Sequence, residues 1–302
     1  MNLGAGECGP GIVKFAKTLK SFNQGQKQAF NMIAAHLNGH ESTRGPLRAF
    51  MSGEGGCGKS FLIHAIETYA RMLFPYEGGI YGPVLIVAPT GKAALGINGR
   101  TICSTFHLLE VKTQLKKYKK LKSSLVTKLQ NLLGNVKLVI IDEVSMLGQE
   151  YAGYMDCVTR LVAPPEKLME PFGGVHLLCV GDFYQLDPIH QGPPLFSKES
   201  SKSSACDQGR SLFESLNTYI NLTEQMRQLS PEDDAFRGFL SRARTGSVTM
   251  QDMDLINSKV RSKEQIDSLE LDSKETLYVA PTCDTVHSVN HSKFNLSKSE
   301  GH

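Results

Sequence analysis

One short glycine-rich stretch constrains this chain more than any other. Residues 53–60 read GEGGCGKS, that is, a glycine, four residues and then Gly-Lys-Ser, which is the phosphate-loop pattern. The mostly apolar residues 47–52 predict a buried strand before it, and apolar residues at helical spacing in 61–73 predict a helix after it. Glycines let backbone N–H groups turn toward phosphate oxygens, and the positive end of the helix dipole lies beside them. The stretch therefore predicts a nucleotide site rather than an ordinary glycine-rich turn.

The last two residues of this stretch have separate expected roles. The Lys59 ammonium is expected to reach the β- and γ-phosphates, and the Ser60 hydroxyl is expected to bind Mg²⁺. The residues of the loop expected to bind the nucleotide are Gly53, Glu54, Gly55, Gly56, Cys57, Gly58, Lys59 and Ser60.

A second buried strand is predicted within residues 136–147, VKLVIIDEVSML, and it ends in Asp142 and Glu143. Ligands of parallel α/β sheets bind at the carboxyl ends of the strands, so this carboxylate pair is expected in the same crevice as the phosphate loop. Asp142 is expected to hold Mg²⁺, directly or through water, and Glu143 to polarise the attacking water. The alternative is an acidic pair on the surface, which is unusual at the end of an all-apolar strand.

Three further stretches continue the α/β pattern. PVLIVAP, at 83–89, is an apolar run of strand length followed by a helix from Thr90, and such runs suit parallel strands buried on both faces. Residues 175–189 predict a third strand, after which Gln185 could sense a γ-phosphate. TYINL, at 218–222, leads toward Arg227, whose guanidinium could bind phosphate bidentately. Taken alone, Gln185 could equally well be a surface residue, and for Arg227 a surface position is the better interpretation.

Residues 111–133 predict a single amphipathic helix, because leucines and a tyrosine recur every three or four residues. Its polar face carries lysines with no acidic residue between them. They form either a solvated face or a contact with nucleic-acid phosphates. These lysines are Lys112, Lys116, Lys117, Lys119, Lys120, Lys122 and Lys128.

The remaining segments carry weaker signals. Residues 190–211, rich in Pro, Ser, Lys and Gly, predict a long surface loop. Residues 233–246 predict a short helix that stops at Gly246. A polar linker is expected at 262–275, then a new strand at 276–281 and a helix after it.

The bulk composition narrows the class of protein. The 302 residues suffice for one large or two ordinary domains, and 40% hydrophobic with 21% charged residues is globular. The net charge of +3 is too small to identify a partner. Seven scattered cysteines without a C-x-x-C pair favour a reducing compartment, and the sequence contains no membrane-spanning run or signal peptide. We expect an intracellular protein, in the nucleus first, with the mitochondrion or cytosol as alternatives.

Six motifs now stand in order: GEGGCGKS, APTGKAA, TICSTFH, VIIDEVSML, GDFYQLDPI and LTEQMRQ. This set resembles the superfamily-one DNA helicases of the PIF-one and Helitron type, relatives of the RecD family. The resemblance covers roughly residues 21–294. Each motif is a moderate signal, whereas six in this order are very specific.

The resemblance implies a parallel α/β, RecA-like phosphate-loop fold, with ATP hydrolysed between two such domains. It also implies binding to single-stranded DNA and duplex junctions, movement in the 5′-to-3′ direction, a monomer, and work in DNA repair, recombination and telomere maintenance. It assigns adenine contact to Gln26, phosphate and Mg²⁺ contact to Lys59 and Ser60, and metal and water contact to Asp142 and Glu143.

The same resemblance assigns γ-phosphate contact to Gln185 and Arg227. Taken alone, Gln26 is better read as a surface residue. Phe106 or His107 would offer a stacking face to a base, and the alternative for Phe106 is a core aromatic. The residues that the resemblance brings to the DNA are Pro89, Thr90, Lys92, Thr105, Phe106 and His107.

The chain departs from the family pattern at its end, where the later motifs and the arginine of the second domain are missing. We expect a lead-in at 1–20, a first RecA-like domain at 21–260, and at 261–302 a linker with the opening of a truncated second domain. Two functions compete: the first motor domain of an ATP-dependent helicase, or a non-motor ATP- and DNA-binding remnant of a transposon-type helicase. A small-molecule kinase would have no use for APTGKAA, TICSTFH or GDFYQ.

Overall fold

The structure is a computed structural model that describes residues 10–39, 45–199, 203–227, 230–262, 265–266, 279–280 and 282–299. The chain divides into two compact units, 1–245 and 246–302, and each is described by itself. The domain boundaries predicted at 20/21 and 260/261 stay predictions. Among the described residues, no helix combines the length and the apolar character that crossing a membrane requires.

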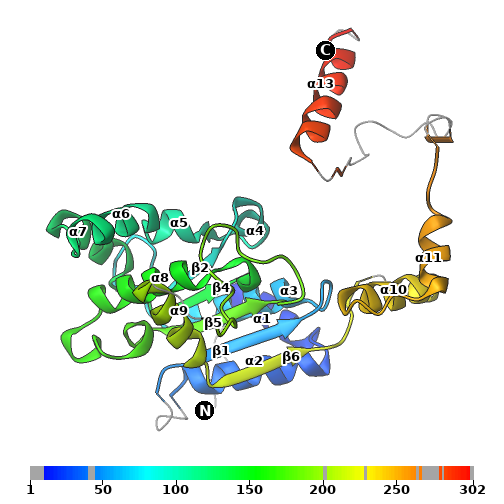
Figure 1. Ribbon diagram of the computed structural model, residues 1–302. Coiled ribbons are helices and arrows are strands. Elements are labelled where there is room, and N and C mark those ends of the chain that lie inside the picture. The colour runs from blue at the N-terminus through cyan, green and yellow to red at the C-terminus, as the bar shows by residue number, and fades with distance from the viewer. Residues whose placement is uncertain are drawn as a thin grey trace. The chain divides into compact units, whose positions relative to one another are not determined.

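The first unit is built on a six-stranded sheet in which every neighbouring pair is parallel, as the apolar runs predict. The strand order is β3-β2-β4-β5-β1-β6, so the strand before the phosphate loop lies between two strands that come later in the chain (Figure 1). The strands are β1 (Arg48–Gly53), β2 (Val84–Ala88), β3 (Arg100–Thr101), β4 (Leu138–Ile141), β5 (His176–Gly181) and β6 (Thr218–Leu222).

Alternating residues of the central strands supply two separate hydrophobic cores. In β4, Leu138 and Ile140 pack into one core and Val139 and Ile141 into the other, because successive side chains of a strand point to opposite faces. The first core is covered by α1 (Pro10–Lys20), α2 (Gln24–Leu37), α3 (Lys59–Leu73) and α4 (Gly91–Gly96). The second is covered by α5 (Ile102–Thr105), α6 (Leu108–Tyr118), α7 (Ser123–Leu133), α8 (Gln149–Val162) and α9 (Ser204–Glu214).

The predicted helices outside the sheet layers are also present. α10 (Asp234–Arg244) matches the helix expected before Gly246, which has a φ of 72°. In the second unit, α13 (Cys283–Ser299) corresponds to the helix expected after 281. α11 (Met250–Asn257) is a helix that the sequence analysis does not predict. The strand predicted at 276–281 and most of the linker before it lie outside the described residues.

Two sequence predictions are wrong. The single helix expected at 111–133 is two helices, α6 and α7, because Lys119 at the end of α6 has a left-handed φ of 59°. The surface loop expected at 190–211 becomes helical at Ser204, where α9 begins. α9 is buried along Cys206, Gly209 and Leu212. The second half of the segment 190–211 is therefore part of the packed structure despite its polar composition.

α8 and α9 approach each other at two glycines. A Cβ atom at Gly153 would overlap the carbonyl oxygen of Ala205, and one at Gly209 would overlap the carbonyl oxygen of Gln149. The close approach of these two helices therefore requires glycine at both positions.

This contact gives a stability prediction. Gly153→Ala should lower the free energy of unfolding by roughly 1–3 kcal/mol, because the added methyl group forces the two helices apart. Gly11→Ala in α1 is the matched control, since nothing lies within 4 Å of its Cβ position, and it should be neutral or slightly stabilising. Urea unfolding of both variants measures the difference. Equal midpoints for the two variants would contradict the helix contact.

Candidate active site

Chain segments that follow four different strands meet at one edge of the sheet. A pocket of about 460 Å³ lies there, which is where parallel α/β sheets bind ligands. All five residues predicted to be catalytic line it. Its lining is Gly55, Gly56, Gly58, Lys59, Ser60, Phe61, Asp142, Glu143, Gln185, Met226 and Arg227.

The phosphate loop has the conformation that its glycines predict. Gly56 and Gly58 have φ values of 92° and 81°, a region that glycine adopts without steric cost. The Lys59 ammonium donates hydrogen bonds to the carbonyl oxygens of Gly53 and Glu54, at 2.7 and 3.0 Å. Lys59 therefore folds back over the loop, and it is one of the residues that line the pocket.

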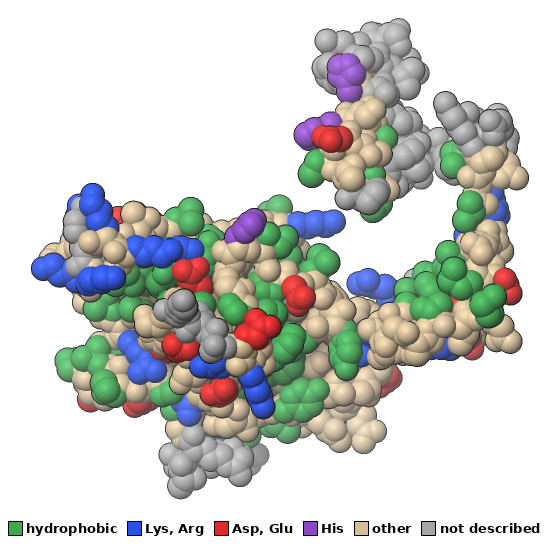
Figure 2. All heavy atoms as spheres, viewed as in Figure 1, with side chains coloured by type: hydrophobic (Ala, Val, Ile, Leu, Met, Phe, Trp, Pro, Cys, Tyr) green, Lys and Arg blue, Asp and Glu red, His purple; other side chains and the backbone are tan. Residues whose placement is uncertain are grey.

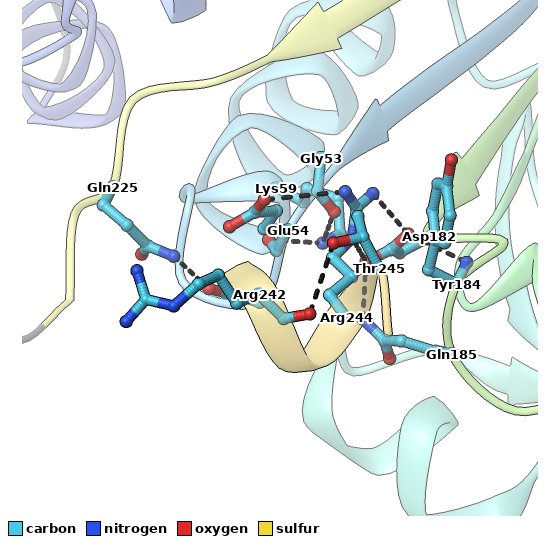
Figure 3. Close-up of polar contacts among 11 residues, drawn as sticks. Gly53, Glu54, Lys59, Asp182, Tyr184, Gln185, Gln225, Arg242, Arg244 and Thr245 are labelled. Carbon is cyan, nitrogen blue, oxygen red and sulfur yellow. Dashed lines mark hydrogen bonds and ion pairs between the residues drawn. The ribbon is translucent and has the colours of Figure 1, made fainter. Parts of the chain in front are cut away.

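The segment after β6 covers the loop from the other side. The Met226 N–H donates to the carbonyl oxygen of Gly56 at 2.9 Å. The Gln225 side-chain amide donates to the carbonyl oxygen of Gly55 at 2.7 Å (Figure 3). A Cβ atom at Gly56 would overlap Oε1 of Gln225. These contacts bring Arg227, the next residue, to the pocket wall.

Asp142 and Glu143 differ in their surroundings. Asp142 is 6% exposed, and burial raises the pKa of its carboxyl from 3.8 to about 6, against the opposing effect of a backbone hydrogen bond at Glu143. Glu143 has a φ of 51°, a conformation that is uncommon outside glycine and that clusters at functional sites. The turn after β4 therefore places both carboxylates on the pocket lining, with Asp142 the more buried of the two.

Four predicted nucleotide residues lie outside this lining: Gln26, Gly53, Glu54 and Cys57. Gln26 is 2% exposed, and its Oε1 accepts a hydrogen bond from the Asn23 N–H at 3.2 Å, which completes the capping box of α2. Its Nε2 lies 3.5 Å from the carbonyl oxygen of Cys57. The Cys57 side chain is buried as well, and burial raises the pKa of its thiol. In this structure Gln26 supports the loop from behind and does not face the pocket.

A second pocket, of about 640 Å³, adjoins the first. Three residues line both pockets: Glu143, Gln185 and Arg227. Thr90 and Lys92, both predicted to contact DNA, line the second pocket only. Ser145 lines it too, and its buried hydroxyl has no hydrogen-bond partner within the described parts of the chain. Pro89 is half-buried at the end of β2.

Two of the predicted DNA contacts are fully buried in this structure. Phe106 is 0% exposed and belongs to the second hydrophobic core, so it has no face on which a base could stack. Thr105 is also 0% exposed, and its hydroxyl donates to the carbonyl oxygen of Thr101. His107 remains partly accessible, and burial lowers the pKa of its imidazole.

An ion pair that the sequence does not predict lies next to the phosphate loop. Arg244, from the last turn of α10, donates two hydrogen bonds to Asp182, at 2.8 and 3.0 Å (Figure 3). Burial alone would raise the pKa of Asp182, but the hydrogen bonds from Arg244 and the Tyr184 backbone hold it below 3.8. Asp182 ends an apolar strand just as Asp142 does, which is a signal that could have identified it. Arg244, 62 residues away, has no such signal.

The raised pKa of Asp142 predicts how stability depends on pH. The folded chain holds this proton more tightly than the unfolded chain, so the stabilisation that the proton gives is present at pH 4 and is lost as the pH rises through about 6. At 1.36 kcal/mol per pKa unit, the loss is on the order of 3 kcal/mol. Without metal, Asp142→Asn should therefore be more stable than the native chain at pH 8, and the difference should shrink toward pH 4. Thermal unfolding with a chelator measures it, and a less stable variant at pH 8 would contradict the assigned cause.

The comparisons with known proteins agree with this geometry. Residues 21–253 match the model of the PIF1-like helicase family. The ATP-dependent DNA helicase PIF1 of Saccharomyces cerevisiae is 32% identical over 225 residues, which are 74% of this chain and 23% of the relative. The chain thus spans about a quarter of the length of the curated relatives it matches.

Two solved structures share the fold. The crystal structure of Pif1 helicase from Candida albicans is 25% identical, with a TM-score of 0.65 over 91% of this chain and 54% of that one. Pif1 from Bacteroides, in complex with ADP-AlF3 and single-stranded DNA, is 23% identical, with a TM-score of 0.57 over 90% and 57%. The first unit therefore has the RecA-like fold of these helicases. With the family match spanning most of its residues, the chain belongs to the PIF1-like helicase family.

Proposed function

We propose that this chain is the first motor domain of an ATP-dependent DNA helicase of the 5′-to-3′ class. One observation carries the proposal: the phosphate loop, two carboxylates, an amide and a guanidinium line one pocket at the edge of the sheet. The names of the curated relatives support it. The proposed catalytic residues are Lys59, Asp142, Glu143, Gln185 and Arg227.

The pocket residues fit a nucleotide bound with Mg²⁺. Phosphate oxygens are charged acceptors and bind an ammonium more strongly than the two carbonyl oxygens that Lys59 now contacts. Ser60 and Asp142 would hold Mg²⁺, which when bound neutralises charge on the β- and γ-phosphates. The buried Asp142 carboxyl, with its pKa of about 6, suits this role because a cation would restore its ionised form.

The remaining residues act on the attacking water and the developing charge. Glu143 takes a proton from the water as its oxygen bonds to the γ-phosphorus and the bond to the ADP oxygen breaks. Gln185 and Arg227 contact the γ-phosphate, and the Arg227 guanidinium offsets negative charge in the transition state. Gln26 contacts adenine only after its amide leaves the capping box of α2.

Single-stranded DNA and duplex junctions are the proposed partners. The second pocket holds Thr90 and Lys92 and shares Glu143, Gln185 and Arg227 with the nucleotide pocket. A DNA strand bound there would touch the residues that surround the γ-phosphate, so DNA and ATP could affect each other's binding. The Bacteroides structure, a complex of Pif1 with both ADP-AlF3 and single-stranded DNA, supports the binding of both ligands at once.

The lysines of α6 and α7 are proposed as a second, nonspecific DNA contact. Figure 2 shows basic side chains gathered over these helices, and six of the lysines are exposed. Lys112 and Lys116 share Glu150 of α8, at 2.6 and 3.9 Å, so an acidic partner that the local sequence lacks comes from another helix. We assign the DNA contact to the exposed lysines on either side of the turn between α6 and α7, Lys116 included, because Lys116 is exposed and its distance to Glu150 is the longer of the two.

We propose a monomer in a reducing intracellular compartment, the nucleus first and the mitochondrion or cytosol as alternatives. The cysteines of the described residues are free thiols, as is typical of such compartments.

The nucleotide assignment predicts opposite behaviour for two variants. Lys59→Ala should lose about 2–3 kcal/mol of affinity for a non-hydrolysable ATP analogue, because a charge-assisted contact to phosphate is removed. In a chain that carries both motor domains, Glu143→Gln should keep this affinity and lower ATP turnover by at least about tenfold, because it removes a base and no metal ligand. Lys27→Ala and Glu166→Gln, two exposed positions, are the controls. Calorimetry and phosphate release measure the effects, and unchanged affinity in Lys59→Ala would contradict the assignment.

The basic helices give a prediction about salt. Replacing Lys116, Lys117, Lys119 and Lys120 with Gln should weaken binding of an oligothymidine strand. The slope of log K against log salt concentration should also become shallower, by roughly 0.7 for each phosphate that is no longer neutralised. The same change at four exposed lysines of α1 and α2 keeps the net charge equal to that of the test variant. That control should leave the slope unchanged. If both variants keep the native slope, the DNA contact proposed for these lysines is contradicted. The control lysines are Lys14, Lys17, Lys20 and Lys27.

A further inference from the structure

The carboxylate of Asp182 is the centre of a hydrogen-bond cluster beside the phosphate loop. Asp182 is 2% exposed and lies just beyond β5. Its Oδ1 accepts from the Tyr184 N–H at 3.1 Å and from Nη2 of Arg244 at 2.8 Å. Its Oδ2 accepts from Nε of Arg244 at 3.0 Å, and Nε2 of Gln185 lies 3.5 Å away. This one carboxylate therefore organises the whole turn from 182 to 185.

Arg244 joins this turn to two other parts of the site. Its Nη1 lies 3.5 Å from Oε1 of Glu54 in the phosphate loop. Its guanidinium carbon lies 4.2 Å from the centre of the Tyr184 ring, a distance typical of a cation–π contact. Figure 3 shows the guanidinium between Asp182 and Glu54. A planar guanidinium can meet both carboxylates and the ring at once, whereas a lysine ammonium lacks the fork that this geometry uses.

The cluster bears on the nucleotide through Gln185. Gln185 lines the nucleotide pocket together with Lys59, and its backbone N–H also donates to the Asp182 carbonyl oxygen at 3.0 Å. Without Arg244, the buried Asp182 carboxylate would lose the charged donors that neutralise it and would be expected to draw its hydrogen bonds from the turn or from water. Gln185 would then lose its fixed orientation, while Lys59 and its two carbonyl partners would be unaffected.

We propose that Arg244 is a positioning residue that, by holding Asp182 and Glu54, fixes the 182–185 turn so that Gln185 faces the γ-phosphate. This inference rests on the proposed function, because it needs a nucleoside triphosphate in the pocket. Arg244 is not one of the residues that line the pocket, and it acts through Asp182. Its effect is therefore on the distinction between triphosphate and diphosphate rather than on nucleotide binding as such.

Calorimetry on the 302-residue chain tests this distinction, with ADP and a non-hydrolysable ATP analogue as probes, both with Mg²⁺. Arg244→Ala should weaken binding of the ATP analogue by about 3- to 10-fold, which is the effect of losing one hydrogen bond. The affinity for ADP should be unchanged. Arg244→Lys should behave like Arg244→Ala, because charge without the fork does not hold the turn. Arg237→Ala is the control, since Arg237 pairs with Asp234 of its own helix, and it should leave both affinities unchanged.

A double variant separates positioning from folding. Asp182→Asn with Arg244→Gln removes both charges together, so no buried charge is left unpaired. The double variant should lose no more affinity for the ATP analogue than the weaker-binding of its two single variants, Asp182→Asn and Arg244→Gln. Both substitutions break the same interaction, so their effects should not add. Equal losses for ADP and the analogue, or none, would overturn the inference. A native chain that binds neither nucleotide would overturn the proposed function first.

Discussion

The burial of the sheet on both faces is the constraint on which the rest of the first unit depends. Residues of β2, β4 and β5 alternate between two hydrophobic cores, which fixes the register of each strand, since a slip by one residue would exchange its two faces. The strands run parallel, so their carboxyl ends lie at one edge. The phosphate loop, Asp142, Asp182 and Arg227 meet there because four separate segments leave the sheet at that edge.

The sequence predicted most of this arrangement because its signals are local. Apolar runs identified the strands, and polar residues directly after them identified Asp142, Glu143 and Gln185. The failures have physical causes. One backbone angle at Lys119 divides a continuous helical pattern, and α9 is buried through small residues whose composition resembles a loop. Phe106 belongs to TICSTFH, a motif predicted to contact DNA, but its side chain is buried in the second core, a choice that the motif does not encode.

The two aspartates that end β4 and β5 show why environment rather than residue type decides chemistry. Both are almost fully buried. Asp182 has a guanidinium on its carboxylate and its pKa is lowered, whereas burial of Asp142 dominates and raises its pKa to about 6. The Asp182 carboxylate is already neutralised by Arg244, whereas the Asp142 carboxylate would be stabilised by a bound cation. Residues far apart in the chain cause this difference, so it could not be deduced from either strand alone.

The contact between Met226 and Gly56 has a consequence for how this site tolerates change over evolution. The hydrogen bond joins main chain to main chain, so most side chains at 226 preserve it, and proline alone would abolish it by removing the N–H. Gly56 is under the opposite constraint, because a side chain there would overlap Gln225. Related sequences should therefore keep glycine at 56, while this hydrogen bond by itself allows any residue except proline at 226.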